Sequence, residues 1–145
     1  MKPYLKYLLI VPAAIFGPYF AVIPAANYLL YHNKVDTFLG ISATKMDSPF
    51  CTTEFSKSDL SDSVTKRNMF LGKESTTYQD NNGDGVVDEI KVDPDIRLKR
   101  ETDYPKFRGV FNRADSEFAE AKKRLEPLIE AFEKEREAKL ASLMD

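Results

Sequence analysis

The feature that most constrains this chain is a long run without charge near its N-terminal end. No Asp, Glu, Lys or Arg occurs from Tyr7 to Tyr31, and Lys2 and Lys6 precede this run. A helix of about 20 apolar residues crosses the roughly 30 Å hydrocarbon core of a bilayer. The run therefore predicts that residues 1–34 form a membrane anchor, with residues 7–31 in contact with the lipid bilayer.

A cleaved signal peptide is the alternative for the same segment. Signal peptides begin with positive charge, continue with a shorter apolar stretch and end at a cleavage site of small residues. Cleavage after Ala25 would place Ile23 where a small residue is preferred, and apolar residues continue beyond this point to Tyr31. We therefore expect an uncleaved anchor, whereas cleavage would make the protein secreted.

The charges on either side of the segment predict its orientation. Lys2, Lys6 and the α-amino group outweigh the charge that follows the segment, where Lys34 is offset by Asp36. The more positive flank of a membrane helix stays in the cytoplasm. The expected localisation is therefore a single-pass membrane protein with a cytoplasmic N-terminus and with residues 35–145 extracytoplasmic.

The polar side chains from Asp80 to Glu89 have a spacing that indicates a cation-binding loop. Three side chains that carry oxygen recur at every second position, namely Asp80, Asn82 and Asp84. Gly85 follows them, and the carboxylate of Asp88 comes four residues after Asp84. Gly85 permits the positive φ that brings the Val86 carbonyl to the same side of the turn. Hard oxygen ligands at this spacing bind Ca²⁺. The expected cofactor is Ca²⁺, and its expected ligands are Asp80, Asn82, Asp84, Val86, Asp88 and Glu89.

Residues 80–91 resemble the calcium-binding loop of the EF-hand family. In this resemblance the three alternating side chains match the first, third and fifth ligand positions, Gly85 matches the turn glycine, and Asp88 matches the ninth position. Lys91 stands where the family has its bidentate Glu, and a lysine cannot coordinate a cation. The resemblance therefore implies weak binding, with a Kd of roughly 10⁻⁴–10⁻³ M.

The flanks of the loop predict strands instead of the two helices of an EF-hand. Residues 75–79 are rich in β-formers, and apolar and polar residues alternate after the loop as far as Val92. Asp93-Pro94 ends this run too early for a stable helix. We expect a strand–loop–strand hairpin with the loop at its tip. A turn without metal is the alternative, because Asn-Gly and Asp-Gly dipeptides mark hairpins in general.

Together with the remaining segments, the hairpin predicts an α+β fold class. Residues 35–73 have the composition of a spacer, in which Leu60, Val64 and Leu71 indicate one short helix. Ile96 and Leu98 alternate with basic residues and predict a third strand against the hairpin. The expected architecture is an N-terminal transmembrane helix, a small antiparallel hairpin or sheet that carries the calcium loop, and a long C-terminal amphipathic helix. The hairpin and the C-terminal helix form one domain over residues 74–145.

The C-terminal helix is predicted from about Ala114 to Met144, with Pro127 either kinking it or starting a second helix. Its apolar residues recur every seven positions, with further apolar residues between them. They are Phe111, Ala114, Phe118, Ala121, Leu125, Leu128 and Phe132. Such a stripe most often packs on the protein's own sheet. Self-association as a short coiled coil, or contact with a protein partner through residues 111–143, is the alternative.

Composition excludes several function classes. The net charge of −2 gives no indication of nucleic-acid binding. The only histidine, His32, follows the apolar run, so a Ser-His-Asp catalytic triad is not expected in the rest of the chain. The only cysteine is Cys51, so a zinc site built from His and Cys is not expected either. We expect a membrane-anchored, extracytoplasmic calcium-binding protein without enzymatic activity, in which Ca²⁺ stabilises the hairpin. The alternative is a membrane-tethered interaction protein that binds no metal and contacts a partner through its C-terminal helix.

Overall fold

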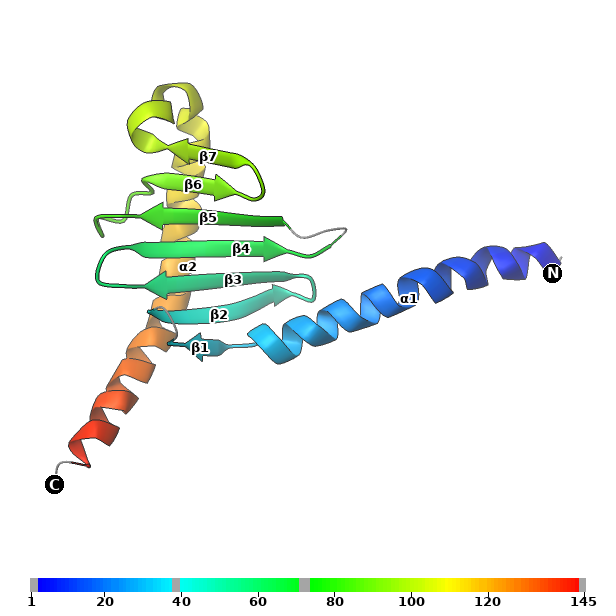
Figure 1. The fold of residues 1–145 in the computed structure, drawn as a ribbon, viewed down its shortest axis with the longest axis horizontal. Helices are drawn as coiled ribbons and strands as arrows, with labels where there is room; N and C mark the ends of the chain where they lie inside the picture. Colours follow the sequence, from blue (N-terminus) through cyan, green and yellow to red (C-terminus); the bar gives the residue numbers. More distant parts are fainter. Residues whose placement is uncertain (1–2, 38–39, 71–73, 144–145) are drawn as a thin grey trace.

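A computed structural model of the chain describes residues 3–37, 40–70 and 74–143, with the backbone alone for residues 3–15. These residues form two helices and one antiparallel sheet (Figure 1). The elements in chain order are α1 (Pro3–Tyr31), β1 (Lys34–Asp36), β2 (Ile41–Ser48), β3 (Cys51–Lys57), β4 (Asp62–Asn68), β5 (Glu74–Asp80), β6 (Glu89–Val92), β7 (Ile96–Lys99) and α2 (Arg100–Ala141).

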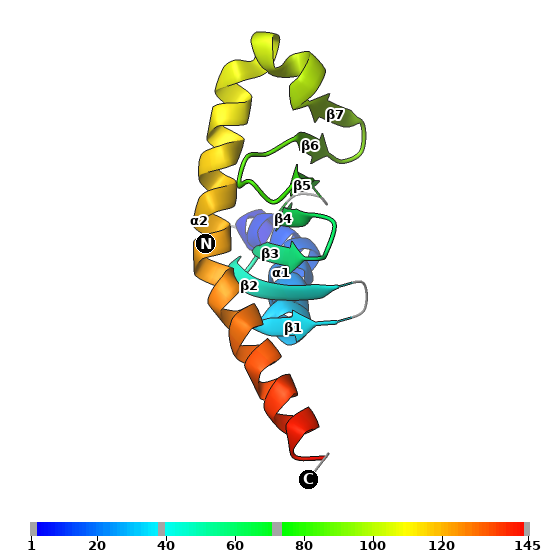
Figure 2. The same ribbon diagram turned by 90° about the vertical axis from the view of Figure 1, so that its left-hand side faces the viewer.

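The sheet is a seven-stranded meander in which each strand pairs with the next one along the chain. One row of directly opposed residues crosses the sheet and comprises Val35, Ala43, Phe55, Val64, Tyr78, Ile90 and Leu98. Because side chains alternate along a strand, this row and the residues two positions away share one face. Figure 2 shows α2 running across that face, so the apolar row is covered by the helix.

The core lies between this face and the apolar stripe of α2. Phe55 of β3 and Phe118 of α2 are both fully buried, with ring centroids 6.5 Å apart in an edge-to-face arrangement. The buried residues of α2 are Phe111, Ala114, Phe118, Ala121, Leu125 and Ile129. These residues of the stripe pack on the chain's own sheet, as the sequence pattern favoured. Self-association and binding of a protein partner through residues 111–143 stay predictions.

The long helix begins earlier than its sequence pattern predicts. α2 starts at Arg100 rather than near Ala114, and its backbone leaves the helical range at Phe107 (φ −116°, ψ 31°). Pro105 lies two residues before this bend, whereas the helix continues through Pro127. Proline removes one backbone donor, and an exposed helix face tolerates this loss when water solvates the freed carbonyl. The predicted end at Met144 lies outside the described residues.

The spacer and short helix predicted for residues 35–73 are also wrong, since the segment contributes strands β1–β4. Val64 lies in β4, is fully buried and pairs with Phe55 on one side and Tyr78 on the other. Leu60 instead lies in the turn before β4 with 85% of its surface exposed. Leu71, the third residue of the predicted helix face, lies outside the described residues.

The predicted transmembrane helix is corrected as well. Over the ranges that the structure describes, no helix is long and apolar enough to cross a membrane. Part of α1 is hydrogen-bonded to segments that flank the strands. The buried Asn27 side chain donates to the Pro49 carbonyl at 2.9 Å, and the Tyr19 hydroxyl donates to the Met69 carbonyl at 2.6 Å. The predicted single-pass localisation, with residues 35–145 extracytoplasmic, rested on this helix and is corrected with it.

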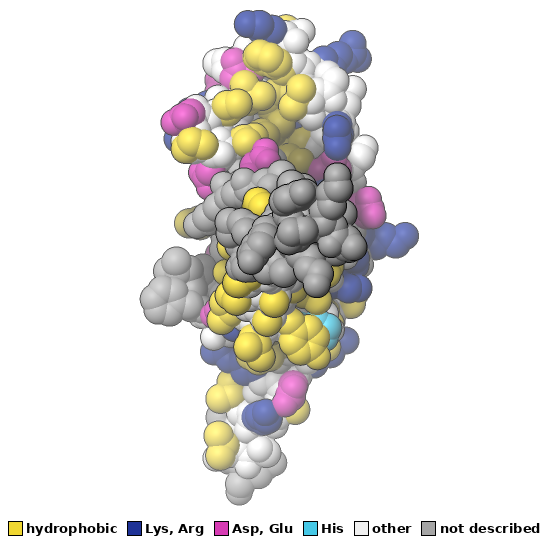
Figure 3. Space-filling view, turned by 90° about the vertical axis from the view of Figure 1, so that its right-hand side faces the viewer, with side chains coloured by type: hydrophobic (Ala, Val, Ile, Leu, Met, Phe, Trp, Pro, Cys, Tyr) yellow, Lys and Arg dark blue, Asp and Glu magenta, His cyan; other side chains and the backbone are white. Residues whose placement is uncertain are grey.

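Hydrophobic side chains gather where α1 leaves the sheet, as Figure 3 shows. Phe20 of α1 contacts Phe50 and Phe70, with ring centroids 5.8 Å and 6.1 Å away. Phe50 and Phe70 in turn lie 5.4 Å apart, so the three rings form one cluster. Edge-to-face and tilted pairs of this kind add to the burial of apolar surface. The cluster therefore joins α1 to the β2–β3 turn and to the segment after β4.

Candidate functional site

The predicted loop lies between β5 and β6, and the hairpin has the expected strand–loop–strand form. Thr76 pairs with Val92 and Gln79 pairs with Glu89, so the register leaves Asp80 at the entry to the loop and Asp88 at its exit. The Asp88 N–H donates to the Gln79 carbonyl at 2.8 Å, which closes the base of the loop. The third strand predicted at Ile96 and Leu98 is β7, which pairs with β6.

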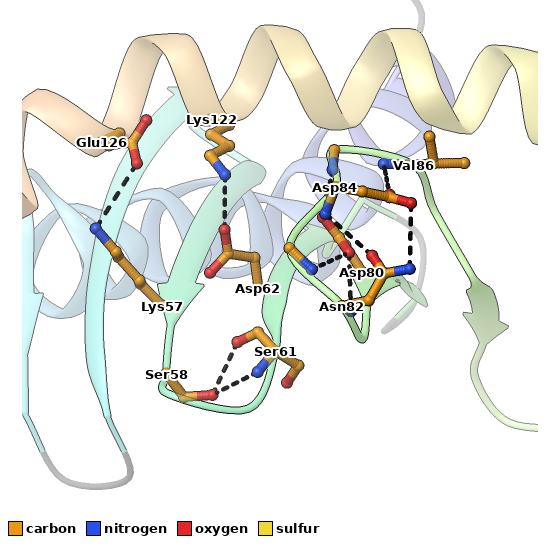
Figure 4. Close-up of polar contacts among 12 residues, drawn as sticks. Lys57, Ser58, Ser61, Asp62, Asp80, Asn82, Asp84, Val86, Lys122 and Glu126 are labelled. Atoms are coloured by element: carbon orange, nitrogen blue, oxygen red, sulfur yellow. Dashed lines mark hydrogen bonds and ion pairs between the residues drawn. The ribbon is translucent and has the colours of Figure 1, made fainter.

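Asp80 organises the loop from its buried entry position. Its side chain is fully buried, and its two carboxylate oxygens accept three backbone N–H groups (Figure 4). Oδ1 accepts from Asn82 at 3.2 Å and Gly83 at 2.8 Å, and Oδ2 accepts from Gly85 at 2.8 Å. A buried carboxylate is costly unless hydrogen bonds compensate its lost hydration. These three amides supply that compensation and wrap the loop around the Asp80 side chain.

The next two alternating residues repeat this geometry nearer the tip. Asn82 Oδ1 accepts the Asp84 N–H at 3.0 Å, and Asp84 Oδ1 accepts the Val86 N–H at 2.8 Å. Gly83 and Gly85 have φ angles of 76° and 84°, which an L side chain rarely adopts. In Figure 4 the polar groups of Asp80, Asn82 and Asp84 approach one another, whereas the Val86 side chain points away. The structure thus brings together three of the predicted ligand side chains.

Two further predicted ligands are placed differently. The Asp88 carboxylate accepts the Asn81 N–H at 2.8 Å, on the same hairpin but at the base of the loop. The buried Glu89 carboxylate pairs with Arg97 and lies 3.8 Å from Lys91. Consecutive residues of an extended chain point to opposite faces, so Glu89 points away from the face that holds Asp88. Glu89 therefore belongs to an ion-pair cluster of the open sheet face.

The sequence-based expectation of a ready-made metal centre is wrong. Among the side chains that the structure describes, no three or more of His, Cys, Asp and Glu form a group that could hold a metal ion. The physical reason is that the acidic side chains of the loop have separate partners: backbone amides for Asp80 and Asp88, and basic side chains for Glu89. The loop instead assembles oxygens of mixed type, from two carboxylates and one amide.

The sequence pattern missed a pair of residues that hold the exit of the loop against α2. Val87 is fully buried, its N–H donates to Asp115 Oδ1 at 2.9 Å, and its carbonyl accepts from Arg100 Nε at 2.6 Å. Arg100 and Asp115 are joined at 2.5 Å, and the Arg100 guanidinium lies 4.9 Å from the Phe111 ring centroid. No local motif indicates this contact, because Asp115 lies far from Val87 in the sequence.

A second polar cluster joins α2 to the sheet at Glu117. Its carboxylate accepts hydrogen bonds from Lys66 at 2.8 Å, Tyr78 at 2.7 Å and Arg113 at 2.7 Å. Burial raises the pKa of Glu117, but these three donors outweigh it and lower the pKa to about 2. Burial and then the bond to Glu117 raise the pKa of Tyr78. Glu117 is thus an ionised carboxylate within a structural network.

We expect the Glu117 network to make the fold acid-sensitive. A carboxylate with a depressed folded-state pKa stabilises the fold above its unfolded pKa, here near 4.5, and loses that contribution as the pH falls towards about 2. Urea unfolding at a series of pH values should therefore show a free energy of unfolding about 2 kcal/mol higher for wild type than for Glu117→Gln at pH 7, which is less than the full linkage value because Lys66 and Arg113 are partly exposed and screened by solvent. The difference should shrink between pH 4.5 and pH 2. A difference that is independent of pH would contradict the assignment.

A cavity of about 340 Å³ adjoins the loop on the side of the α2 N-terminus. Its lining residues are polar or charged, namely Asn81, Asn82, Asp88, Glu89, Lys99 and Glu101. Such a lining suits a hydrated ion or water better than an apolar ligand.

Comparisons with protein-family models, with curated proteins and with solved structures find no match to this chain.

Proposed function

We propose that the β5–β6 loop binds Ca²⁺ and that the ion acts structurally, by stabilising the hairpin against α2. The observation that carries the proposal is the wrapped loop. In it, the side-chain oxygens of Asp80, Asn82 and Asp84 each accept the backbone N–H of the residue two positions later in the chain. This arrangement keeps their oxygens on the inside of one turn. The ion would complete the site by drawing in further oxygens, and it would not occupy a ready-made acidic group.

The donor set of the loop fits this chemistry. Calcium takes hard oxygen ligands from carboxylates, side-chain amides, backbone carbonyls and water, in flexible geometry. A carboxylate oxygen has two lone pairs, so Asp80 Oδ2 can keep its bond to Gly85 and accept a cation as well. The residues that would hold the ion are Asp80, Asn82, Asp84 and the Val86 carbonyl, and Asp88 would be one of the further oxygens that the ion draws in from the base of the loop. Asp84 and Asn82 are exposed, which leaves access for the ion.

The role follows from where the loop is docked. The backbone of Val87, directly after the proposed carbonyl ligand, is held by Arg100 and Asp115 of α2. An ion that orders residues 80–88 would therefore also hold the hairpin on the helix. A ligand that binds only the folded state stabilises it by RT ln(1 + [L]/Kd), or about 1 kcal/mol when Ca²⁺ exceeds Kd several-fold.

Calorimetry and thermal melting of the full chain test the proposal. We expect Ca²⁺ titration to release or absorb heat with a Kd of roughly 10⁻⁴–10⁻³ M. The melting temperature should rise by about 2–5 °C in millimolar Ca²⁺ relative to chelator. Asp84→Asn is the matched variant, because this exposed side chain can change without opening the core, and it should bind at least about tenfold more weakly. An absence of heat together with unchanged melting would instead favour an interaction protein without metal.

A further inference from the structure

A groove lies beside α2, between the helix and strands β5 and β6, with a volume of about 440 Å³. Its apolar lining residues are Ile90, Val92, Gly109, Val110 and Ala114. Figure 3 shows hydrophobic side chains gathered over the upper half of the molecule, the height at which β6 and the first part of α2 lie in Figure 1. A concave site of this volume with an apolar lining suits a small ligand that has an apolar part.

Gly109 keeps the helix side of the groove open. Apart from neighbouring parts of its own helix, no heavy atom lies within 4 Å of the point where a Cβ would stand at this position. Glycine is a poor helix former, so the helix gains no stability from the missing side chain. A larger residue at Gly109 would project into open space without meeting the sheet, and it would therefore fill part of the groove.

Arg113 lies at the polar end of the groove. Among the described residues that line the groove, Arg113 carries the only charge, and Thr76 and Tyr78 are the other polar residues. Arg113 Nε donates to Glu117 at 2.7 Å, while the Arg113 side chain stays 81% exposed. A guanidinium has further N–H donors on its two Nη atoms, and these have no partner in the described part of the chain. Glu117 also accepts from Lys66 at 2.8 Å, so one carboxylate is shared between two cations.

We propose that the groove binds a free fatty acid, with its alkyl chain between α2 and β6 and its carboxylate on Arg113. A guanidinium and a carboxylate form two parallel hydrogen bonds, and the Nη donors of Arg113 are available for such a pair. The described lining supplies one positive charge and no carboxylate, which complements a monoanion that carries an alkyl chain. This site is separate from the proposed Ca²⁺ loop, and binding at one does not depend on the other.

Calorimetric titration of the full-length protein with dodecanoate tests the proposal, in chelator so that no Ca²⁺ competes for the carboxylate. We expect one saturable site with a Kd of roughly 10⁻⁵–10⁻⁴ M, the order that burial of about eight methylene groups provides. An absence of saturable binding would overturn the inference.

Methyl resonances locate the bound chain, because α1 also exposes apolar side chains such as Val22 and Leu29. Dodecanoate should shift the methyl resonances of Val92 and Val110, which line the groove, and leave those of Val22 and Leu29 in place. Shifts confined to α1 would contradict the inference. Vesicles of phosphatidylglycerol also present alkyl chains with negative charge. If they shifted the Val110 resonances and dodecanoate did not, the groove would contact a lipid surface and the inference would be wrong.

Gly109→Leu should weaken dodecanoate binding at least about tenfold, because the new side chain takes the place of several methylene groups. Its melting temperature should equal or exceed that of wild type, since leucine favours a helix more than glycine does. Ala119→Leu is the matched control, at an exposed position of α2 outside the groove, and it should leave the Kd within about twofold. Wild-type affinity in Gly109→Leu would overturn the inference.

Arg113→Gln should weaken dodecanoate binding about tenfold and leave the Kd of the uncharged analogue dodecanol within about twofold, because only the acid pairs with the guanidinium. Arg113 is exposed, so its replacement should not unfold the protein. Arg136→Gln removes the same charge from an exposed position of α2 outside the groove and should leave both Kd values within about twofold. If Arg113→Gln bound dodecanoate as tightly as wild type, or lost affinity for the acid and the alcohol equally, the carboxylate would lie elsewhere and the inference would be wrong.

Discussion

Replacing Phe118 with Ala is expected to lower the free energy of unfolding by about 3–5 kcal/mol. Phe118 is fully buried at the centre of the interface between α2 and the sheet, where it meets the Phe55 ring edge-to-face. The described core consists of one helix stripe against one sheet face, so a cavity here has few neighbouring side chains that can move to fill it. Urea unfolding in the presence of chelator measures the effect without any contribution from Ca²⁺.

Leu140→Ala is the matched control for this substitution. Leu140 lies on the same helix but beyond the sheet, with 54% of its surface exposed. Its truncation should change the free energy of unfolding by no more than about 0.5 kcal/mol. If Phe118→Ala cost as little as Leu140→Ala, the packing of α2 on the sheet would be wrong.

Replacing Asp80 with Asn is expected to abolish the proposed Ca²⁺ binding and to destabilise the protein even without the ion. The Asp80 carboxylate accepts three backbone N–H groups, whereas an amide has one acceptor oxygen and an NH₂ group that would face one of these donors. A lost hydrogen bond to a buried charged acceptor costs about 1.5–3 kcal/mol. In chelator, Asp80→Asn should therefore unfold at lower urea concentration than wild type.

Asp84→Asn separates the two effects of the Asp80 substitution. Asp84 is exposed and accepts the Val86 N–H, a bond that the oxygen of an amide can retain. In chelator this variant should lie within about 0.5 kcal/mol of wild type, while its calorimetric Ca²⁺ response is weakened. If Asp80→Asn were as stable as wild type in chelator, Asp80 would not be the residue that organises the loop.

Several elements were predictable because their signals are local. The hairpin was indicated by β-forming residues before a glycine-rich turn and by alternation of apolar and polar residues after it, and its loop has the predicted positive φ at Gly85. The third strand followed from the alternation of Ile96 and Leu98. The apolar stripe of α2 was visible as a seven-residue repeat, and Phe111, Phe118 and Leu125 are buried as members of one helix face.

The strands β2–β4 were not predictable from their composition. Each of them contributes few apolar side chains to the core, such as Ala43, Phe55 and Val64, while the other face is mostly polar. A strand of this kind resembles a Ser- and Thr-rich spacer when read alone. It becomes part of the fold only because a neighbouring strand lies on each side and α2 covers its few apolar residues.

The spacing of residues within short windows determined the hairpin, the oxygen-lined turn and the apolar face of the long helix, since turn chemistry and periodicity act between near neighbours. Tertiary structure alone decided that Glu89 pairs with Arg97, that Asp115 holds Val87 and that Lys122 meets Asp62 beside Asp80. The partners in the last two contacts lie far apart in the chain. Such contacts depend on strand register and on where the helix crosses the sheet, and no local pattern encodes either.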